Sequence, residues 1–126
     1  MRGSDWITYR MAEAADLSGA GIYRWSIGDD VYVGKAARLR SRLREYLNNV
    51  AKIEEGRPYR KGDPLGFRQI HRQLALAKGR GLRVEWDVIE TCPDKSLLLE
   101  RERHWIETLL PSMNGPRKAL RGGTHD

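Results

Sequence analysis

Basic side chains gather in one short stretch of this sequence, and their type suits contact with phosphate groups. Five of them fall within ten positions: Lys35, Arg38, Arg40, Arg42 and Arg44. A guanidinium can bind two phosphate oxygens at once. The net charge of +6 and the isoelectric point near 9.8 fit the electrostatic footprint of a nucleic-acid-binding protein. The alternative is a solvated basic face, but the clustering favours binding of DNA or RNA.

A helix is expected to carry these residues after Gly34. On a helical wheel of about 100° per residue, four apolar side chains form one buried stripe: Leu39, Leu43, Tyr46 and Leu47. Residues four apart lie on one face, so Arg42 and Tyr46 are predicted to meet at the border between core and solvent. Arg40 and Arg44 are predicted to face water.

A carboxylate on a second apolar stripe also has the potential for chemistry. The last helix is predicted to begin near Pro93-Asp94 and to end before Pro111. Its apolar stripe consists of Leu98, Trp105, Ile106 and Leu109. Glu102 lies within that stripe, whereas Glu100 points to solvent. A buried carboxylate is costly unless it is paired or binds a metal. The residues alone favour an ion pair with an arginine at the edge of the core over a metal ligand.

The elements that must position these side chains begin with a hairpin. β-Branched and aromatic residues at 22–25 and 31–33 flank a turn that is rich in Gly and Asp. A third strand is predicted over 82–90, where apolar and charged residues alternate. Helices are predicted over 12–17 and 67–78. The fold is therefore expected to be α+β, with a small three-stranded, mostly antiparallel sheet flanked by helices.

Residues 49–66 are polar and interrupted by Gly and Pro, which predicts a long surface loop. Three basic residues in it are expected to contact a nucleic-acid backbone: Arg57, Arg60 and Lys61. In the helix that follows, a lone histidine, His71, is expected to be a packing or surface residue rather than a catalyst.

Length and composition indicate one domain. Of the 126 residues, 40% are hydrophobic and 32% are charged, as in soluble globular proteins. No run of 18 apolar residues could span a membrane, and the N-terminus lacks the apolar core of a signal peptide. The single cysteine, Cys92, excludes an internal disulfide and a multi-cysteine zinc site. A cytoplasmic protein with no membrane partner is expected.

The hairpin contains two triplets, Gly21-Ile22-Tyr23 and Tyr32-Val33-Gly34, and here the sequence resembles the GIY-YIG nuclease family. Arg42 follows the second triplet by the family's spacing of eight residues, and Tyr46 stands where the family has His or Tyr. The resemblance is to a single nuclease module, like the N-terminal one of UvrC-type excision nucleases and those of GIY-YIG homing endonucleases. It implies the GIY-YIG nuclease fold.

The last helix extends the resemblance as far as Asn114. Glu102 occupies the place of the family's metal-binding glutamate, and Asn114 follows it after twelve residues, as in the family. The resemblance implies that Glu102 holds Mg²⁺ or Mn²⁺ and that Asn114 orients Glu102 or a metal-bound water. One carboxylate suffices because Mg²⁺ keeps several waters and takes phosphate oxygens as ligands.

The implied function is that of a metal-dependent endonuclease that hydrolyses DNA phosphodiester bonds, with branched, damaged or flapped DNA among the expected substrates. Arg42 is expected to bind the phosphate. Tyr23 is expected to be the general base, with Tyr32 and Tyr46 as hydrogen-bonding partners. An ordinary tyrosine pKa near 10 is too high for this role, so Lys35, Arg42 and the metal are expected to lower it.

The alternative is a non-catalytic nucleic-acid-binding module that keeps the fold and the basic surface. In either case residues 1–19 are expected to be a lead-in segment, 20–115 the nuclease domain and 116–126 a basic flexible tail. Lys35 and Arg38 are expected to add contacts to nucleic acid. Specificity is expected to come from the loops, DNA structure, a homodimer or a partner protein.

Overall fold

The computed structural model describes residues 5–10 and 15–114 of the chain. In chain order the elements are β1 (Ile7–Tyr9), β2 (Gly21–Ile27), β3 (Asp30–Ala36), α1 (Leu39–Glu54), α2 (Gln69–Gly79), β4 (Val84–Thr91), the 3-10 helix η3 (Lys95–Leu97), α3 (Leu98–Leu109) and the 3-10 helix η4 (Ser112–Asn114). Within these residues, no helix is both long and apolar enough to cross a membrane.

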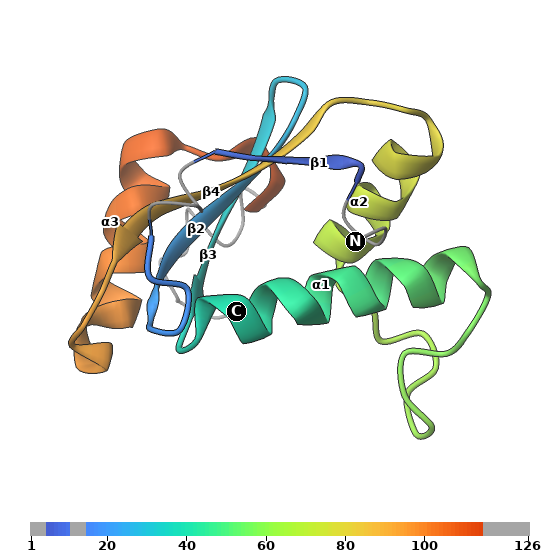
Figure 1. The fold of residues 1–126 in the computed structure, drawn as a ribbon, viewed down its shortest axis with the longest axis horizontal. Helices are drawn as coiled ribbons and strands as arrows, with labels where there is room; N and C mark the ends of the chain where they lie inside the picture. The colour runs from blue at the N-terminus through green and yellow to red at the C-terminus, as the bar shows by residue number, and fades with distance from the viewer. Residues whose placement is uncertain (1–4, 11–14, 115–126) are drawn as a thin grey trace.

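The sheet has four strands in the order β1-β4-β2-β3 (Figure 1). The central strand β2 is antiparallel to both β3 and β4, which confirms the predicted hairpin and the predicted third strand. The expectation of three strands is corrected by β1, which pairs parallel to β4 with Ile7 opposite Val84. This strand has three residues, too few for an alternating pattern to be recognised in sequence.

Each face of the sheet buries a separate apolar cluster, because successive strand residues point to opposite sides. Tyr23, Trp25 and Trp86 belong to the cluster that includes residues of α1 and α2. Ile22 and Val33 belong to the cluster that includes Ile106 of α3. Figure 1 shows α3 on one side of the sheet, with α1 and α2 on the other. The α+β class is thus confirmed.

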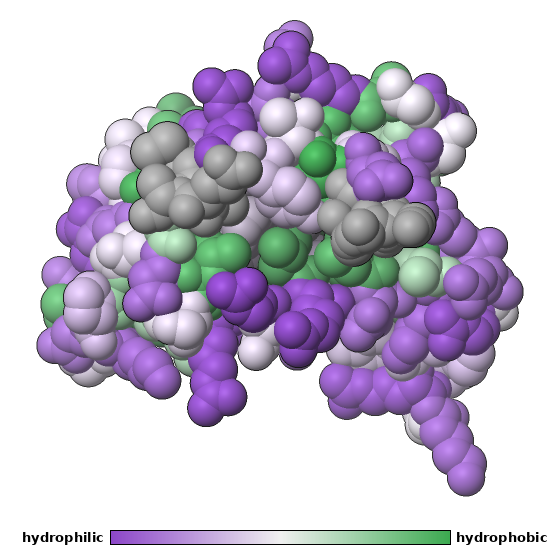
Figure 2. Space-filling model, in the orientation of Figure 1, coloured by the Kyte–Doolittle hydropathy of each residue, from purple (hydrophilic) through white to green (hydrophobic). Residues whose placement is uncertain are grey.

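The helices predicted after Gly34, over 67–78 and before Pro111 are present with shifted boundaries. Helix α1 continues through the first residues of the predicted 49–66 loop, since Val50 is buried and Ile53 packs against the core. Leu43 and Leu47 are only partly buried. Figure 2 shows hydrophilic side chains over most of one face of the molecule, with a narrow hydrophobic band across its middle.

Two other boundaries differ from prediction. Leu82 is exposed, and β4 begins at Val84. The predicted short helix at 12–17 lies partly outside the described residues, and residues 15–17 are not helical. The predicted tail at 116–126 lies wholly outside the described residues.

The two triplets meet across the hairpin, where Tyr23 lies directly opposite Gly34. A Cβ atom at residue 34 would overlap the hydroxyl end of the Tyr23 side chain. Tyr23 is only 1% exposed, so it has little room to move. The absence of a side chain at residue 34 therefore allows the tyrosine to lie across β3.

We predict that Gly34→Ala destabilises the protein by about 1–3 kcal/mol, because the added methyl group overpacks a filled core. The melting temperature should fall by roughly 5–15 °C, which thermal unfolding followed by circular dichroism would measure. Gly62→Ala is the matched control, since a Cβ atom there meets nothing within 4 Å. Equal melting temperatures for the two variants would show that Tyr23 can move away freely.

Candidate functional site

Three tyrosines gather on the sheet face that carries α1 and α2. Tyr23 from β2, Tyr32 from β3 and Tyr46 from α1 all belong to the apolar cluster on this face. The hydroxyls of Tyr23 and Tyr46 are 2.7 Å apart and hydrogen-bonded, and their rings pack edge to face. Tyr23 and Tyr46 are 1% and 0% exposed, whereas Tyr32 is 8% exposed. Tyr32 is therefore the most accessible of the three.

Arg68, at the N-cap of α2, joins this cluster, a role that was not predicted from the sequence. Its Nη1 donates to the Tyr32 hydroxyl at 3.4 Å and its Nη2 donates to the Tyr46 hydroxyl at 3.2 Å. The guanidinium also lies 5.7 Å from the centre of the Tyr46 ring. An arginine at the start of a predicted helix, where the helix dipole disfavours a cation, was the one local signal of an unusual role.

The burial of Tyr23 and Tyr46 keeps their hydroxyls neutral. Burial raises the pKa of Tyr23 to about 12, and the nearby Tyr32 adds to the effect. The Tyr46 hydrogen bond and the charges of Arg42 and Arg68 act in the opposite direction and do not overcome it. Burial likewise raises the pKa of Tyr46 well above its usual range. Tyr23 therefore keeps its own proton at neutral pH and is not available as a base there.

Arg42 and Glu102 are linked through Lys35, on the unpaired edge of β3. Arg42 Nη1 donates to the Lys35 carbonyl oxygen at 3.2 Å, and Lys35 Nζ lies 3.6 Å from Glu102 Oε1. Because side chains alternate along β3, Tyr32 contributes to the α1 side of the sheet, whereas Lys35 reaches Glu102 of α3. The candidate site thus draws on elements from both faces of the sheet.

Glu102 is 6% exposed, and it is confirmed as a carboxylate buried on the apolar side of α3, whereas Glu100 is exposed. The ion pair that was considered as an alternative exists, with a lysine in place of the expected arginine. Among the described residues, no group of three or more His, Cys, Asp and Glu side chains could hold a metal. A single carboxylate matches Mg²⁺, whose remaining ligands can be water and phosphate oxygens.

Asn114 and Ser112 cover the edge of β3. Asn114 Oδ1 accepts from the Val33 N–H and Asn114 Nδ2 donates to the Val33 carbonyl, both at 2.8 Å. Ser112 Oγ accepts from the Val31 N–H at 3.1 Å. Both polar ends of the Asn114 amide therefore bind the backbone of β3. The contact predicted from the sequence was with Glu102 or with a metal-bound water.

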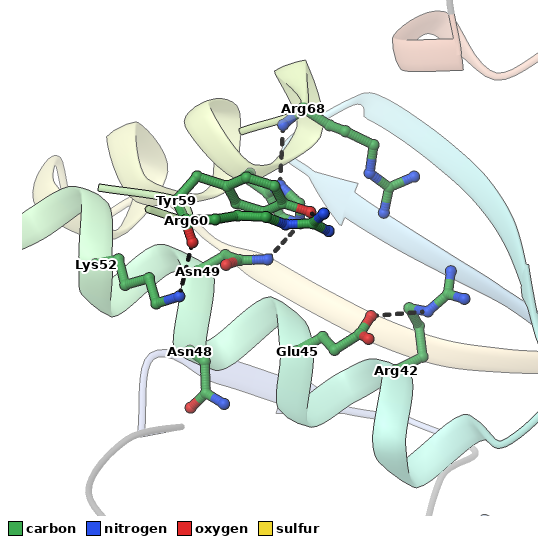
Figure 3. Close-up of a pocket in the computed structure, with 9 residues that line it drawn as sticks. Arg42, Glu45, Asn48, Asn49, Lys52, Tyr59, Arg60 and Arg68 are labelled. Atoms are coloured by element: carbon green, nitrogen blue, oxygen red, sulfur yellow. Dashed lines mark hydrogen bonds and ion pairs between the residues drawn. The ribbon is translucent and has the colours of Figure 1, made fainter. Parts of the chain in front are cut away.

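A polar pocket of about 460 Å³ opens beside the tyrosine cluster (Figure 3). It is lined by Arg42, Glu45, Asn48, Asn49, Lys52, Tyr59, Arg60, Arg68 and His71. Lys52 Nζ donates to the Tyr59 carbonyl at 3.0 Å, which ties the 55–68 segment to α1. The pocket therefore lies between one face of α1 and the segment that leads into α2.

The predicted nucleic-acid contacts separate into two groups. Arg60 lines the pocket, and its guanidinium lies 4.7 Å from the centre of the Tyr59 ring. Arg57 is exposed and paired with Glu55 at 2.7 Å. Lys61 and Arg38 are also exposed. The structure thus brings Arg60 to the site and does not show Arg38, Arg57 or Lys61 in its lining.

His71 is 3% exposed and forms part of the wall of the pocket. Its Nδ1 accepts from the Arg68 backbone N–H at 3.0 Å, and its Nε2 lies 3.3 Å from Asn49 Nδ2. Burial, assisted by the charges of Arg68, Arg42 and Arg72, lowers the pKa of His71 to about 4. His71 is therefore neutral at physiological pH, in agreement with the packing role expected from sequence.

Comparisons with known proteins point to one family. A profile of the GIY-YIG catalytic domain matches residues 19–115. Two curated relatives, from Nocardia farcinica and Mycobacterium leprae, are both named UvrABC system protein C; each is 30% identical, over 88% and 87% of this chain. The chain spans 14% of the length of each relative. No solved structure matches the chain significantly.

We predict that His71 makes stability depend on pH between about 6.5 and 4. The unfolded chain takes up a proton at this histidine near pH 6.5, whereas the native ring resists protonation down to a pKa of about 4. The stabilisation is complete above pH 6.5 and decreases as the pH falls, with a slope approaching about 1.4 kcal/mol per pH unit.

Urea unfolding of wild type and His71→Gln across this range would measure the difference in slope. Other effects of pH on stability come from carboxylates with lowered pKa values, Asp16, Glu90 and Asp94. Their protonation lowers stability mainly below about pH 4. Because wild type and His71→Gln both contain them, they do not alter the difference between the two proteins. The exposed residue His104 provides the control, His104→Gln. Parallel curves for wild type and His71→Gln would contradict the prediction.

Proposed function

The chain belongs to the GIY-YIG family, and from this we propose that it is an endonuclease that hydrolyses DNA phosphodiester bonds with the help of Mg²⁺ or Mn²⁺. The observation that carries the proposal is the position of Arg42. Its guanidinium donates to the backbone carbonyl of Lys35 on the edge of β3, and the Lys35 side chain forms an ion pair with Glu102. Arg42 also lines the same pocket as Arg68. A phosphate group at Arg42 would therefore bind a guanidinium that is held next to Lys35, the partner of Glu102, and that shares a pocket with Arg68, the partner of Tyr32 and Tyr46.

Arg42 is proposed to hold the phosphate that is cleaved. Its side chain is 33% exposed, and its fork is fixed by the Lys35 carbonyl and by Glu45. Glu45 is mostly exposed, so a phosphate can replace it as the partner of the guanidinium at low cost. A positioned guanidinium stabilises the negative charge that develops on the phosphate oxygens in the transition state.

Tyr32 is proposed as the group that receives the proton of the attacking water. Its hydroxyl accepts a hydrogen bond from Arg68 Nη1 at 3.4 Å, and it is the most exposed of the three tyrosines. Tyr23 is less suited to this role, since it is buried against Gly34 and Tyr46 and its pKa is raised to about 12. The proposal therefore gives Tyr23 and Tyr46 the role of positioning Arg68 and Tyr32.

Glu102 is proposed as the protein ligand of the divalent cation. When bound, such a cation would neutralise charge on the phosphate and favour ionisation of a water. The Lys35 side chain is 42% exposed, so it can turn from Glu102 into solvent or toward a phosphate. The tyrosine cluster and the buried carboxylate are what the family's reaction requires, and no observation favours the alternative of a non-catalytic binding module.

We predict that Glu102→Gln abolishes nicking of supercoiled plasmid in Mg²⁺ and in Mn²⁺ while DNA binding in EDTA persists. The substitution removes the ligand charge and keeps the shape. Loss of the ion pair with the half-exposed Lys35 should cost under about 1 kcal/mol, so the melting temperature in EDTA should change little. Glu100→Gln is the control. A variant that melts far below wild type but still nicks plasmid would assign Glu102 a purely structural role.

We predict that Tyr32→Phe lowers the cleavage rate by about 10²–10⁴, as expected for loss of a general base, whereas Tyr23→Phe lowers it less than about tenfold. Both variants keep the ring and its packing. Single-turnover cleavage at saturating enzyme separates the rate from DNA affinity, which should be unchanged in both. A larger loss for Tyr23→Phe would return the role of base to Tyr23.

A further inference from the structure

The pocket beside the tyrosine cluster carries more positive charge than the proposed reaction uses. Its lining contains four basic side chains, Arg42, Lys52, Arg60 and Arg68, and one acidic side chain, Glu45. His71 adds no charge near neutral pH, because its pKa is lowered to about 4 by burial and by the neighbouring arginines. The lining therefore favours an anion.

The hydrogen-bond donors in the pocket differ in how many of their N–H groups already have a partner within the protein. Lys52 is bound to the Tyr59 carbonyl and holds the wall in place. The Arg60 side chain makes one hydrogen bond among the described residues, from Nη2 to the Tyr59 hydroxyl at 3.0 Å. Asn48 on α1 is exposed, and Figure 3 draws its amide pointing away from the helix axis. Arg60 thus has N–H groups available for a ligand.

The pocket is continuous with the site proposed for cleavage through Arg42 and Arg68, which belong to both. Its volume of about 460 Å³ falls within the range that ligand sites commonly have. A nucleic-acid strand with one phosphate at Arg42 must continue past it in two directions. Arg42 is held at the Lys35 carbonyl, and the Lys35 side chain pairs with Glu102, whereas Arg42 and Arg60 line the same pocket.

We propose that this pocket binds the phosphate next to the one that is cleaved, with Arg60 as its principal contact. The assignment rests on the proposed function, since it places the first phosphate at Arg42. A neighbouring phosphate held at Arg60 fixes the direction of the strand through the site. Arg57, paired with Glu55 on the same segment, takes no part in this contact.

The test uses two probes in EDTA, thymidine 3′,5′-bisphosphate and thymidine 5′-monophosphate, with affinities measured by isothermal titration calorimetry. Arg60→Gln should weaken binding of the bisphosphate by roughly tenfold, as for loss of one charged hydrogen bond. It should leave binding of the monophosphate within about twofold, because one phosphate still reaches Arg42. Arg44→Gln is the matched control: Arg44 is an exposed arginine on α1 outside the pocket lining, and its loss should leave both affinities unchanged.

Three results would overturn the assignment. The first is equal bisphosphate affinity for wild type and Arg60→Gln, including failure of both to bind. The second is an equal loss in Arg60→Gln and Arg44→Gln, which would indicate general charge attraction. The third is an equal loss for both probes, which would make the pocket the site of the first phosphate. Melting temperatures confirm that each variant is folded.

The affinities of the two probes do not depend on whether the protein cleaves DNA, because they are measured in EDTA, without metal. A protein that binds the bisphosphate through Arg60 and leaves plasmid uncut would contradict the endonuclease proposal while the phosphate pocket stands. A protein that cuts plasmid, and whose Arg60→Gln variant binds the bisphosphate like wild type, would contradict the pocket alone.

Discussion

The outer edge of β3 is the constraint on which the rest of the site depends. Its backbone groups at Val31, Val33 and Lys35 point away from β2 and need partners. Ser112 accepts from the Val31 N–H, Asn114 binds both backbone groups of Val33, and Arg42 donates to the Lys35 carbonyl. Hydrogen bonds from side chains to the β3 backbone therefore attach both η4 and α1 to the same strand. They also fix Arg42, on which phosphate binding would depend.

The interior of the site combines polar groups with deep burial. Tyr23 and Tyr46 share a hydrogen bond in the core, and Arg68 reaches their neighbourhood from the surface. In a medium of low polarity such a network holds its geometry firmly, because an unpaired hydroxyl would be costly there. The same burial raises the pKa values of the hydroxyls, so any proton transfer depends on charges brought near them.

Local patterns in the sequence predicted the parts of this structure that local forces determine. Strand alternation predicted the hairpin that places Tyr23 opposite Gly34, and helical periodicity predicted the burial of Glu102. Arg68 reaches the tyrosines from 22 and 36 positions away along the chain, and no periodicity encodes such a contact. The binding of Asn114 to Val33 across 81 positions was missed for the same reason.

Neither border of the sheet offers a long free strand edge, and this bears on how the molecule behaves at high concentration. Beyond β4 lies β1, a strand of three residues, and beyond β3 lie the side chains that occupy its backbone groups. A free border is a template on which another chain can add a strand, the first step toward fibrous assembly. The contacts that shape the site thus also protect the sheet from joining with the sheets of neighbouring molecules.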